Sequence, residues 1–221
     1  MTEPTLEDYL LFLKSPDADV RRNAAWWLGR QRDIRIVEAL IPVLNDPDPT
    51  VRLRVAESLG NMKDDRAVMP LVTALSDDDV QVRTAVINAL GLQGDWRALD
   101  AIVMQLGAAE AQIRMAAADA LAKLPDARAV GALVGRLLED EDPDVRYSAS
   151  RALGEIGQPA VDLLLLALHG EPDVSAKLYM AEILAKAHDQ RAVTPLKVLT
   201  EDDDEAVRET AKWALKQLGA S

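Results

Sequence analysis

One short segment recurs seven times along the 221-residue chain, and this recurrence constrains the fold more than any other feature. Each copy contains an anchor pair, a small apolar residue followed by a basic one. The anchor pairs are 31 residues apart, or once 32, and are Val20-Arg21, Val51-Arg52, Val82-Arg83, Ile113-Arg114, Val145-Arg146, Ala176-Lys177 and Val207-Arg208. A leucine follows eight residues after the first residue of every anchor pair. A fixed period of this length predicts a stack of equal supersecondary units.

The spacing of apolar residues inside each repeat predicts two helices. Val51, Val55 and Leu59 are four residues apart and therefore share one helical stripe. A second stripe lies between successive anchor pairs, as at Val37 and Leu40. Seven repeats of this kind predict about fourteen helices and no strands.

An acidic residue three positions before each anchor pair marks the start of the second helix. A carboxylate at this place accepts hydrogen bonds from unpaired backbone N–H groups and interacts favourably with the helix dipole. These residues are Asp17, Asp48, Asp79, Glu110, Asp142, Asp173 and Asp204. The other turn of each repeat commonly has a glycine leaving one helix and an acidic residue entering the next.

Three short motifs follow one another in the second repeat: Asp-x-x-Val-Arg at 48–52, Leu-Gly at 59–60 and Asp-x-Arg-Ala-Val at 64–68. These residues resemble the HEAT-like repeats first recognised in phycobilisome (bilin) lyases, and the resemblance covers nearly the whole chain. It implies an all-α fold, a right-handed α-solenoid of about seven HEAT-like helix pairs. Relatives of this shape include bilin lyase subunits, deoxyhypusine hydroxylase, a class of DNA glycosylases and scaffolds without chemistry, so the fold does not name the activity.

Composition bounds the domain organisation and the partners. The repeats continue from Pro4 to Leu218 without a Gly/Ser-rich or Pro-rich linker, which predicts one solenoid domain over residues 1–221. A net charge of −12 opposes binding to nucleic acid or to an anionic membrane. Since the sequence shows neither a secretory signal nor a membrane span, we expect a cytoplasmic protein.

Residues for catalysis or metal binding are scarce. The chain has no cysteine and two histidines, His169 and His188, both at predicted helix ends where the ring favours the C-terminal dipole. No His-Glu pair is present, which sets aside the di-iron chemistry of deoxyhypusine hydroxylase that the family resemblance raises. We therefore predict no catalytic residue, no cofactor and no metal site, while a bilin lyase-type subunit stays open.

The basic residues of the anchor pairs allow two interpretations. They recur on one side of the stack and could bind phosphate groups. Each also has acidic residues in its own and adjacent turns, and a guanidinium can bridge carboxylates or helix-end carbonyls. We expect these residues to hold neighbouring repeats in register.

The candidate partner-binding surface comes from the variable positions of the second helices. The family resemblance implies that these helices line a concave face, with exposed side chains two, three, six and ten residues after the anchor. Those positions vary along the chain and include aromatic, Met and charged residues, as a contact surface would. The predicted partner-binding residues are Arg22, Trp26, Arg30, Arg54, Glu57, Asn88, Met115, Asp119, Tyr147, Arg151, Tyr179, Glu182 and Trp213.

The four tryptophans have different expected roles. Trp26 and Trp213 are either covers for the end repeats or contacts for a ligand, and both alternatives stay open. Trp27 lies about 100° further around the same helix and should pack against the first helix near Tyr9. Trp96 opens a first helix and is expected to cover a loop.

Three functions are compatible with these observations. The first is a non-enzymatic protein–protein interaction module or scaffold that binds a helix or extended peptide of another protein on the concave face. The alternative is a bilin lyase-type subunit or a chaperone for tetrapyrrole attachment, suggested by the family resemblance. A nucleic-acid binder ranks last, because the predicted face carries Glu57, Asp119 and Glu182.

Overall fold

The periodic apolar stripes fold into helices throughout residues 3–31, 33–170 and 172–220, which are the residues that the computed structural model describes. Fourteen α-helices are present in this part of the chain and no strand is, which confirms the all-α class and the expected number of helices. The chain divides into two units, Met1–Ala120 and Leu121–Ser221, and the division falls within helix α8. Each unit is described by itself.

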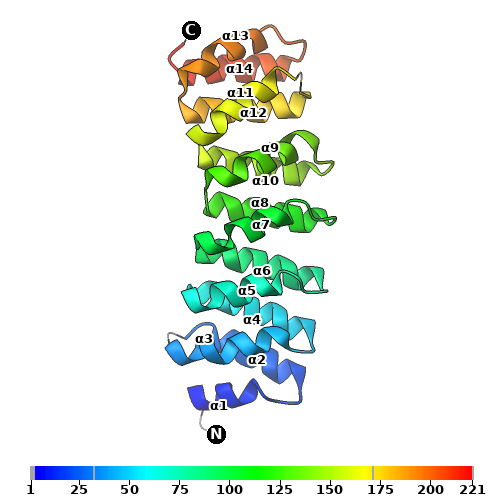
Figure 1. The fold of residues 1–221 in the computed structure, drawn as a ribbon, viewed down its shortest axis with the longest axis vertical. Coiled ribbons are helices and arrows are strands. Elements are labelled where there is room, and N and C mark those ends of the chain that lie inside the picture. The colour runs from blue at the N-terminus through cyan, green and yellow to red at the C-terminus, as the bar shows by residue number, and fades with distance from the viewer. Residues whose placement is uncertain (1–2, 32, 171, 221) are drawn as a thin grey trace. The chain divides into compact units, whose positions relative to one another are not determined.

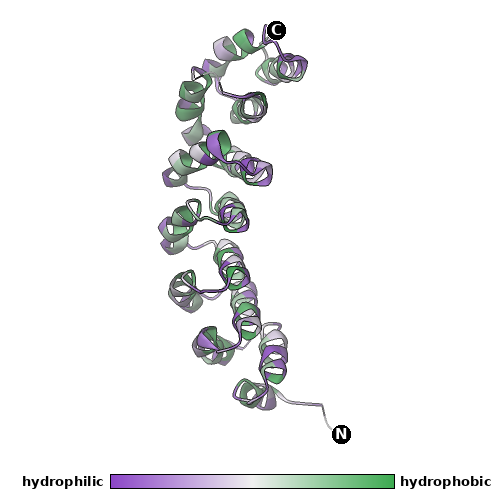
Figure 2. Cartoon of the chain, turned by 90° about the vertical axis from the view of Figure 1, so that its right-hand side faces the viewer, coloured by the Kyte–Doolittle hydropathy of each residue, from purple (hydrophilic) through white to green (hydrophobic). Residues whose placement is uncertain are grey.

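Unit 1 consists of helix pairs in which a short first helix precedes a longer second helix. The first helices are α1 (Leu6–Phe12), α3 (Ile34–Leu40), α5 (Val68–Ala74) and α7 (Leu99–Gln105). The second helices are α2 (Ala18–Leu28), α4 (Pro49–Met62), α6 (Val80–Gln93) and α8 (Ala111–Lys123). Within the unit, the first helices form one layer and the second helices form another (Figures 1 and 2).

Unit 2 repeats this arrangement. Its first helices are α9 (Val130–Glu139), α11 (Val161–Leu168) and α13 (Val193–Leu199). Its second helices are α10 (Pro143–Ile156), α12 (Val174–Ala187) and α14 (Glu205–Gln217). The helices of this unit are coloured from green at α9 to red at α14 in Figure 1.

Short 3-10 turns accompany the first helices and were not expected from the sequence. One, η1 (Ile41–Asn45), follows α3 and contains Pro42, whose ring interferes with continued α-helical hydrogen bonding. The others precede first helices and are η2 (Asp65–Ala67), η3 (Trp96–Ala98), η4 (Ala127–Ala129), η5 (Gln158–Ala160) and η6 (Gln190–Ala192). In all of these but η5 an aspartate caps the turn through its side chain, which is the acidic residue expected at the entry to a first helix.

The second helices begin where the acidic residues predict. Six of the seven predicted carboxylates accept N–H groups of the first helical turn: Asp17, Asp48, Asp79, Asp142, Asp173 and Asp204. The seventh carboxylate, that of Glu110, accepts a hydrogen bond from the side chain of Arg83 at 2.8 Å.

The repeated leucines form the centre of the core in both units. All seven are buried: Leu28, Leu59, Leu90, Leu121, Leu153, Leu184 and Leu215. The apolar anchor residues are buried too, except that Val20 in the first pair is partly exposed because no preceding second helix covers it. Burying one such side chain contributes about 1.5–3 kcal/mol, so each repeat supplies its neighbours with part of a shared core.

Glycines let the second helices of unit 1 approach closely. A Cβ atom added at Gly60 would lie 2.7 Å from the Cα and Cβ of Ala89 on the next second helix. Gly91 stands in the same relation to Ala120, at 2.9 Å. Only hydrogen fits at these contacts, so the glycine that follows the repeated leucine sets the distance between adjacent second helices.

The basic residues of the anchor pairs connect successive repeats. Arg52 donates to both carboxylate oxygens of Asp77 in the next repeat at 2.7 and 2.8 Å, and to the carbonyl of Asp46 in its own turn at 2.9 Å. Arg21 binds Asp46 in the same way, at 2.6 and 2.7 Å. Equivalent links between repeats are Arg83 to Glu110, Arg146 to Asp173 and Lys177 to Asp202. We call this set of links the anchor ladder, and it confirms the expected role for these five basic residues. Arg208, in the last repeat, donates to the carbonyls of Asp202 and Asp203 in its own turn.

Two carboxylates of the anchor ladder, Asp77 and Asp46, are held in their charged form. Burial alone would raise the pKa of Asp77, but hydrogen bonds from Arg52 and from the Asp79 backbone N–H outweigh this effect and leave the pKa below its ordinary value. The same balance lowers the pKa of Asp46, where Arg21 is the principal donor. The links of Arg52 to Asp77 and of Arg21 to Asp46 are therefore ion pairs at neutral pH.

A second series of arginines occurs at the entries to the first helices. Arg66 donates to both carboxylate oxygens of Asp64, which caps η2, and also pairs with Glu38 of the preceding repeat at 2.8 Å. Arg191 likewise binds its capping aspartate and reaches Asp162 at 2.6 Å. The opposite ends of the helix pairs are thus also linked between repeats.

Candidate partner-binding face

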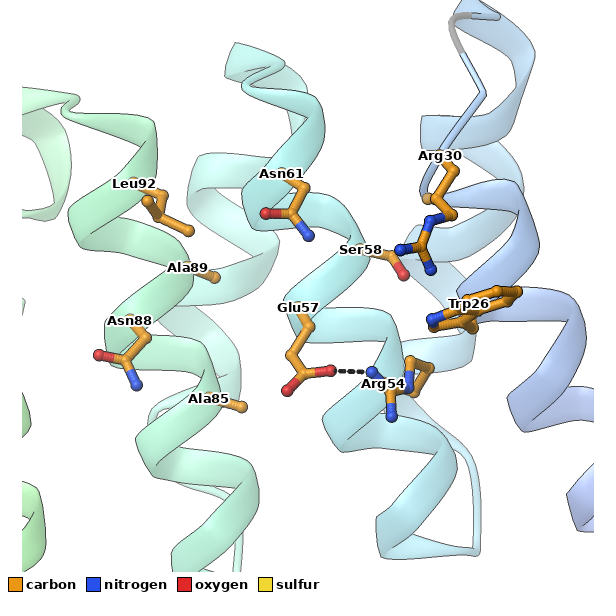
Figure 3. Close-up of a pocket in the computed structure, with 11 residues that line it drawn as sticks. Trp26, Arg30, Arg54, Glu57, Ser58, Asn61, Ala85, Asn88, Ala89 and Leu92 are labelled. Atoms are coloured by element: carbon orange, nitrogen blue, oxygen red, sulfur yellow. Dashed lines mark hydrogen bonds and ion pairs between the residues drawn. The ribbon is translucent and has the colours of Figure 1, made fainter.

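A cavity of about 570 Å³ opens between the second helices of unit 1 (Figure 3). It is lined by residues of α2, α4 and α6, together with Gly29 and Arg30 directly after α2. We call this side of the three helices the second-helix face. The prediction that second helices carry the accessible variable residues places the candidate surface on this same side.

Small residues form the floor of this cavity. Ser58, Ala85 and Ala89 line it from α4 and α6, and all three are buried or nearly so. The Ser58 hydroxyl donates to the carbonyl of Ala25 at 2.9 Å, which satisfies this polar group and ties α4 to α2. Because the floor residues are short, the longer side chains around them leave a hollow.

Trp26 and Arg30 form one wall of the cavity. The guanidinium carbon of Arg30 lies 4.0 Å above the centre of the Trp26 ring, one helical turn away (Figure 3). The ring remains 46% exposed despite this contact. Such a stacked cation contributes about 0.5–1 kcal/mol at an exposed site and holds the indole in one orientation. An aromatic surface held this way is pre-organised for contact with a ligand.

Polar groups on α4 and α6 complete the lining. Arg54 and Glu57 form an ion pair three residues apart on α4. Among the described residues, the side-chain amides of Asn61 and Asn88 have no hydrogen-bond partner. With Arg54 and Glu57 neutralising each other, Arg30 gives the lining a net positive charge.

A second cavity, of about 470 Å³, adjoins the first. Gly29, Arg30 and Asn61 line both cavities, and Lys63 at the C-terminal end of α4 lines only the second. The two spaces are therefore neighbours that share a wall at Arg30 and Asn61.

Three predicted residues of unit 1 lie outside these cavities. Arg22 is ion-paired with Asp19 at 2.8 Å on the first turns of α2. Met115 and Asp119 are partly buried on α8 and line neither cavity. The structure thus brings together five of the predicted residues in unit 1: Trp26, Arg30, Arg54, Glu57 and Asn88.

The predicted residues of unit 2 form smaller groups. The rings of Tyr147 on α10 and Tyr179 on α12 have their centres 6.3 Å apart. Glu182 and Trp213 line a cavity of about 390 Å³, and the Trp213 side chain is 47% exposed. Arg151 is exposed on α10 and does not line this cavity. All thirteen predicted residues are at least partly accessible.

The predicted packing of the tryptophan rings agrees with the structure for Trp27 but not for Trp96. Trp27 stacks on Tyr9 at 4.0 Å with ring planes 9° apart, as expected for a side chain packed against the first helix. Trp96 is 69% exposed, so the expectation that it covers a loop is wrong. It lies at the first position of η3, before a first helix.

Both histidines end helices, as predicted: His169 follows α11 and His188 follows α12. Within the described ranges, His and carboxylate side chains form no group of three or more that could hold a metal ion. Every helix in the part of the chain that the structure describes is too short or too polar to cross a membrane.

Several lining residues were not singled out from the sequence. Asn61 occupies the same repeat position as Arg30, ten residues after the anchor, so the repeat pattern did contain a signal for it. Ser58 resembles a core position, and only the close approach of α2 and α4 reveals that it lines a hollow. Lys63 follows the helix end and has no counterpart in the pattern of exposed positions.

Comparison with known proteins agrees with the repeat pattern. The family description HEAT repeats matches residues 6–91, 37–113, 69–154, 103–173 and 161–221. The uncharacterized phycocyanin operon protein Z of Pseudanabaena tenuis (strain PCC 7409) is 34% identical over 83 residues, which are 37% of this chain and 41% of that protein. The chain therefore matches less than half the length of this curated relative.

Solved structures show the same fold. A chain of the complex of CpcE and CpcF of phycocyanin lyase from Nostoc sp. PCC7120 aligns with a TM-score of 0.64 and 25% identity, over all of this chain and 91% of that one. Human deoxyhypusine hydroxylase aligns with a TM-score of 0.51 and 20% identity, over 97% of this chain and 96% of that one, a likeness of fold alone. The repeat pattern, the helix pairs and the family match agree along the chain, which belongs to the HEAT repeat family.

Proposed function

We propose that the protein is a non-enzymatic interaction module that binds a segment of another protein on the second-helix face of unit 1. The observation that carries this proposal is the half-exposed Trp26 ring, held in place by Arg30 at the wall of a cavity of about 570 Å³. Tryptophan and arginine are the residues most enriched among the energetic centres of protein interfaces. A large pre-oriented ring beside free amides offers both apolar contact and hydrogen bonds to a peptide.

The cavity suits a helix or an extended segment better than a deeply bound small molecule. Its lining comes from three successive second helices and is open to solvent, so a ligand would lie across repeats. The unpaired amides of Asn61 and Asn88 each offer one donor group and one acceptor, which matches the N–H and C=O of a peptide backbone.

Affinity capture with matched tryptophan variants tests this proposal. The wild type, Trp26→Ala and Trp96→Ala would be used to capture proteins from the source cell's lysate, with identification by mass spectrometry. Trp96 is the better exposed of the two rings but lies at the start of a first helix, so its replacement controls for a general loss of apolar surface. We expect a protein that is captured by the wild type and by Trp96→Ala and is lost with Trp26→Ala. Equal capture by all three would contradict the proposal.

The comparisons support a second candidate function, that of a bilin lyase-type subunit or a chaperone for tetrapyrrole attachment. The aligned structure from Nostoc is a phycocyanin lyase complex, and the curated relative is named for a phycocyanin operon. In this role Trp26 would stack on the tetrapyrrole plane, and Arg30 would pair with a propionate group. Mixing the protein with free bilin and recording the visible spectrum separates this candidate from the first. A band shift that is lost with Trp26→Ala supports it, and an unchanged spectrum contradicts it.

A further inference from the structure

The charged side chains that line the two cavities of unit 1 include paired and unpaired groups. Three carboxylates line the cavities, and each is ion-paired with a nearby arginine: Glu57 with Arg54, Asp33 with Arg35 and Asp64 with Arg66. Arg30 and Lys63, in contrast, have no ion-pair partner among the residues that the structure describes. Both of these cations line the second cavity, in a chain whose net charge is −12.

The backbone at Lys63 is unusual for a lysine. Its φ is 52° and its ψ is 47°, in the left-handed region, where a Cβ atom is unfavourable. The equivalent residue, twelve positions after the anchor, is a glycine with positive φ in three other repeats: Gly94, Gly157 and Gly219. A residue kept in a costly conformation where its equivalents are glycine points to a role for its side chain.

The other non-glycine residue with positive φ in the described part of the chain is His188, at the same repeat position in unit 2. It too lines a cavity, the one that contains Trp213. The two units therefore each replace the favoured glycine where a cavity is present. Lys63 differs in that it provides a permanent positive charge.

We propose that Arg30 and Lys63 bind the carboxylates of an acidic segment of a partner protein, while Trp26 packs against an apolar group of the same segment. This assignment rests on the proposed function and specifies the chemistry of the partner. Charge complementarity carries it, because Arg30 and Lys63 are available for ion pairs with an incoming carboxylate, whereas the carboxylates of the same lining already receive hydrogen bonds from arginines. The free Asn61 amide, which lines the second cavity together with both cations, can donate a hydrogen bond to the same segment.

Binding of two labelled peptides by fluorescence anisotropy tests the assignment. One peptide alternates glutamate and alanine around a central leucine, and the other has glutamine in place of glutamate. At low salt we expect the glutamate peptide to bind more tightly by about 5- to 10-fold, the factor that two solvent-accessible ion pairs supply. Arg30→Gln and Lys63→Gln should each reduce the ratio of the two peptide affinities to about the square root of its wild-type value, because each removes one of the two ion pairs. Lys197→Gln, an exposed lysine of α13, should leave it unchanged.

Replacement by glycine separates a functional lysine from a merely tolerated one. Lys63→Gly should raise the melting temperature by roughly 2–4 °C, because it removes the cost of the left-handed conformation, and should weaken binding of the glutamate peptide. His188→Gly should raise the melting temperature similarly without changing peptide binding. A variant that gains stability and loses only the charge preference identifies the lysine as a ligand-binding residue.

Equal affinity of the wild type for the two peptides, or a preference that survives Arg30→Gln and Lys63→Gln, would overturn the assignment. Competition by free glutarate as effective as that by the glutamate peptide would also overturn it, by assigning the site to a small dicarboxylate. Failure of the acidic-segment assignment can be distinguished from failure of the proposed function. If the peptide preference is absent while capture still depends on Trp26, the interaction module stands and the acidic partner does not.

Discussion

Substituting Asp77 by asparagine removes one carboxylate of the anchor ladder with almost no change of shape. Arg52 donates two hydrogen bonds to this carboxylate, at 2.7 and 2.8 Å, and the side chains are 16% and 9% exposed. Asparagine keeps one acceptor oxygen and turns an amide donor toward the guanidinium, so one charge-assisted hydrogen bond and the ion pair are lost. We expect the free energy of unfolding to fall by about 2 kcal/mol, the value of one hydrogen bond to a charged group.

Thermal unfolding followed by circular dichroism measures this effect. For a chain of this size, about 2 kcal/mol corresponds to a decrease of roughly 4–8 °C in melting temperature. Glu110→Gln is the matched control, because Glu110 pairs with Arg83 of the preceding repeat but is 41% exposed. An exposed pair contributes at most about 1 kcal/mol, so the control should change the melting temperature by less than roughly 4 °C. Equal changes in the two variants would refute the argument that burial gives the ladder its strength.

Two further predictions follow from other features of the fold. Gly60→Ala should destabilise the protein by about 1–3 kcal/mol, because the added Cβ would lie 2.7 Å from Ala89. Gly154→Ala, whose added Cβ would have no atom nearer than 3.7 Å, should be neutral or stabilising by up to about 1 kcal/mol. Urea unfolding measures both changes. Hydrogen bonds from Arg35 lower the pKa of Asp33 to about 2, so the stability that this pair provides is complete above the ordinary aspartate pKa and is lost as the pH falls from about 4 toward 2. Melting temperatures between pH 7 and pH 2.5 would check this, and the variant Asp33→Asn should lose less stability over that range than the wild type does.

The sequence predicted the repeating architecture well because each repeat carries the same local signals. Three signals each specify helix pairs, and they agree: the spacing of apolar residues, the capping carboxylates and the constant spacing of the anchor pairs along the chain. The role of Arg52 could also be anticipated, since its charge recurs beside acidic turns. Its acceptor Asp77 could not be identified, because only the stacking of adjacent turns decides which of Asp77, Asp78 and Asp79 faces the guanidinium.

The sequence predicted the candidate site less completely than it predicted the repeat fold. Trp26 and Arg54 were found from their repeat positions, which vary where the core does not. The hollow itself depends on three short residues on two helices, and no single stretch of sequence contains them. Lys63 was missed because its significance lies in a backbone angle, which becomes visible only beside the glycines at equivalent positions.

Hydroxyl-radical footprinting of the protein bound to its captured partner tests most directly whether the second-helix face of unit 1 is the binding surface. The method reports oxidation of exposed side chains, and Trp26 and Trp96 provide an internal comparison, since both are accessible in the free protein. The proposed function predicts that partner binding protects Trp26 from oxidation and leaves Trp96 as reactive as before. Protection of Trp96 with Trp26 unchanged would contradict it and would place the partner on the first helices instead.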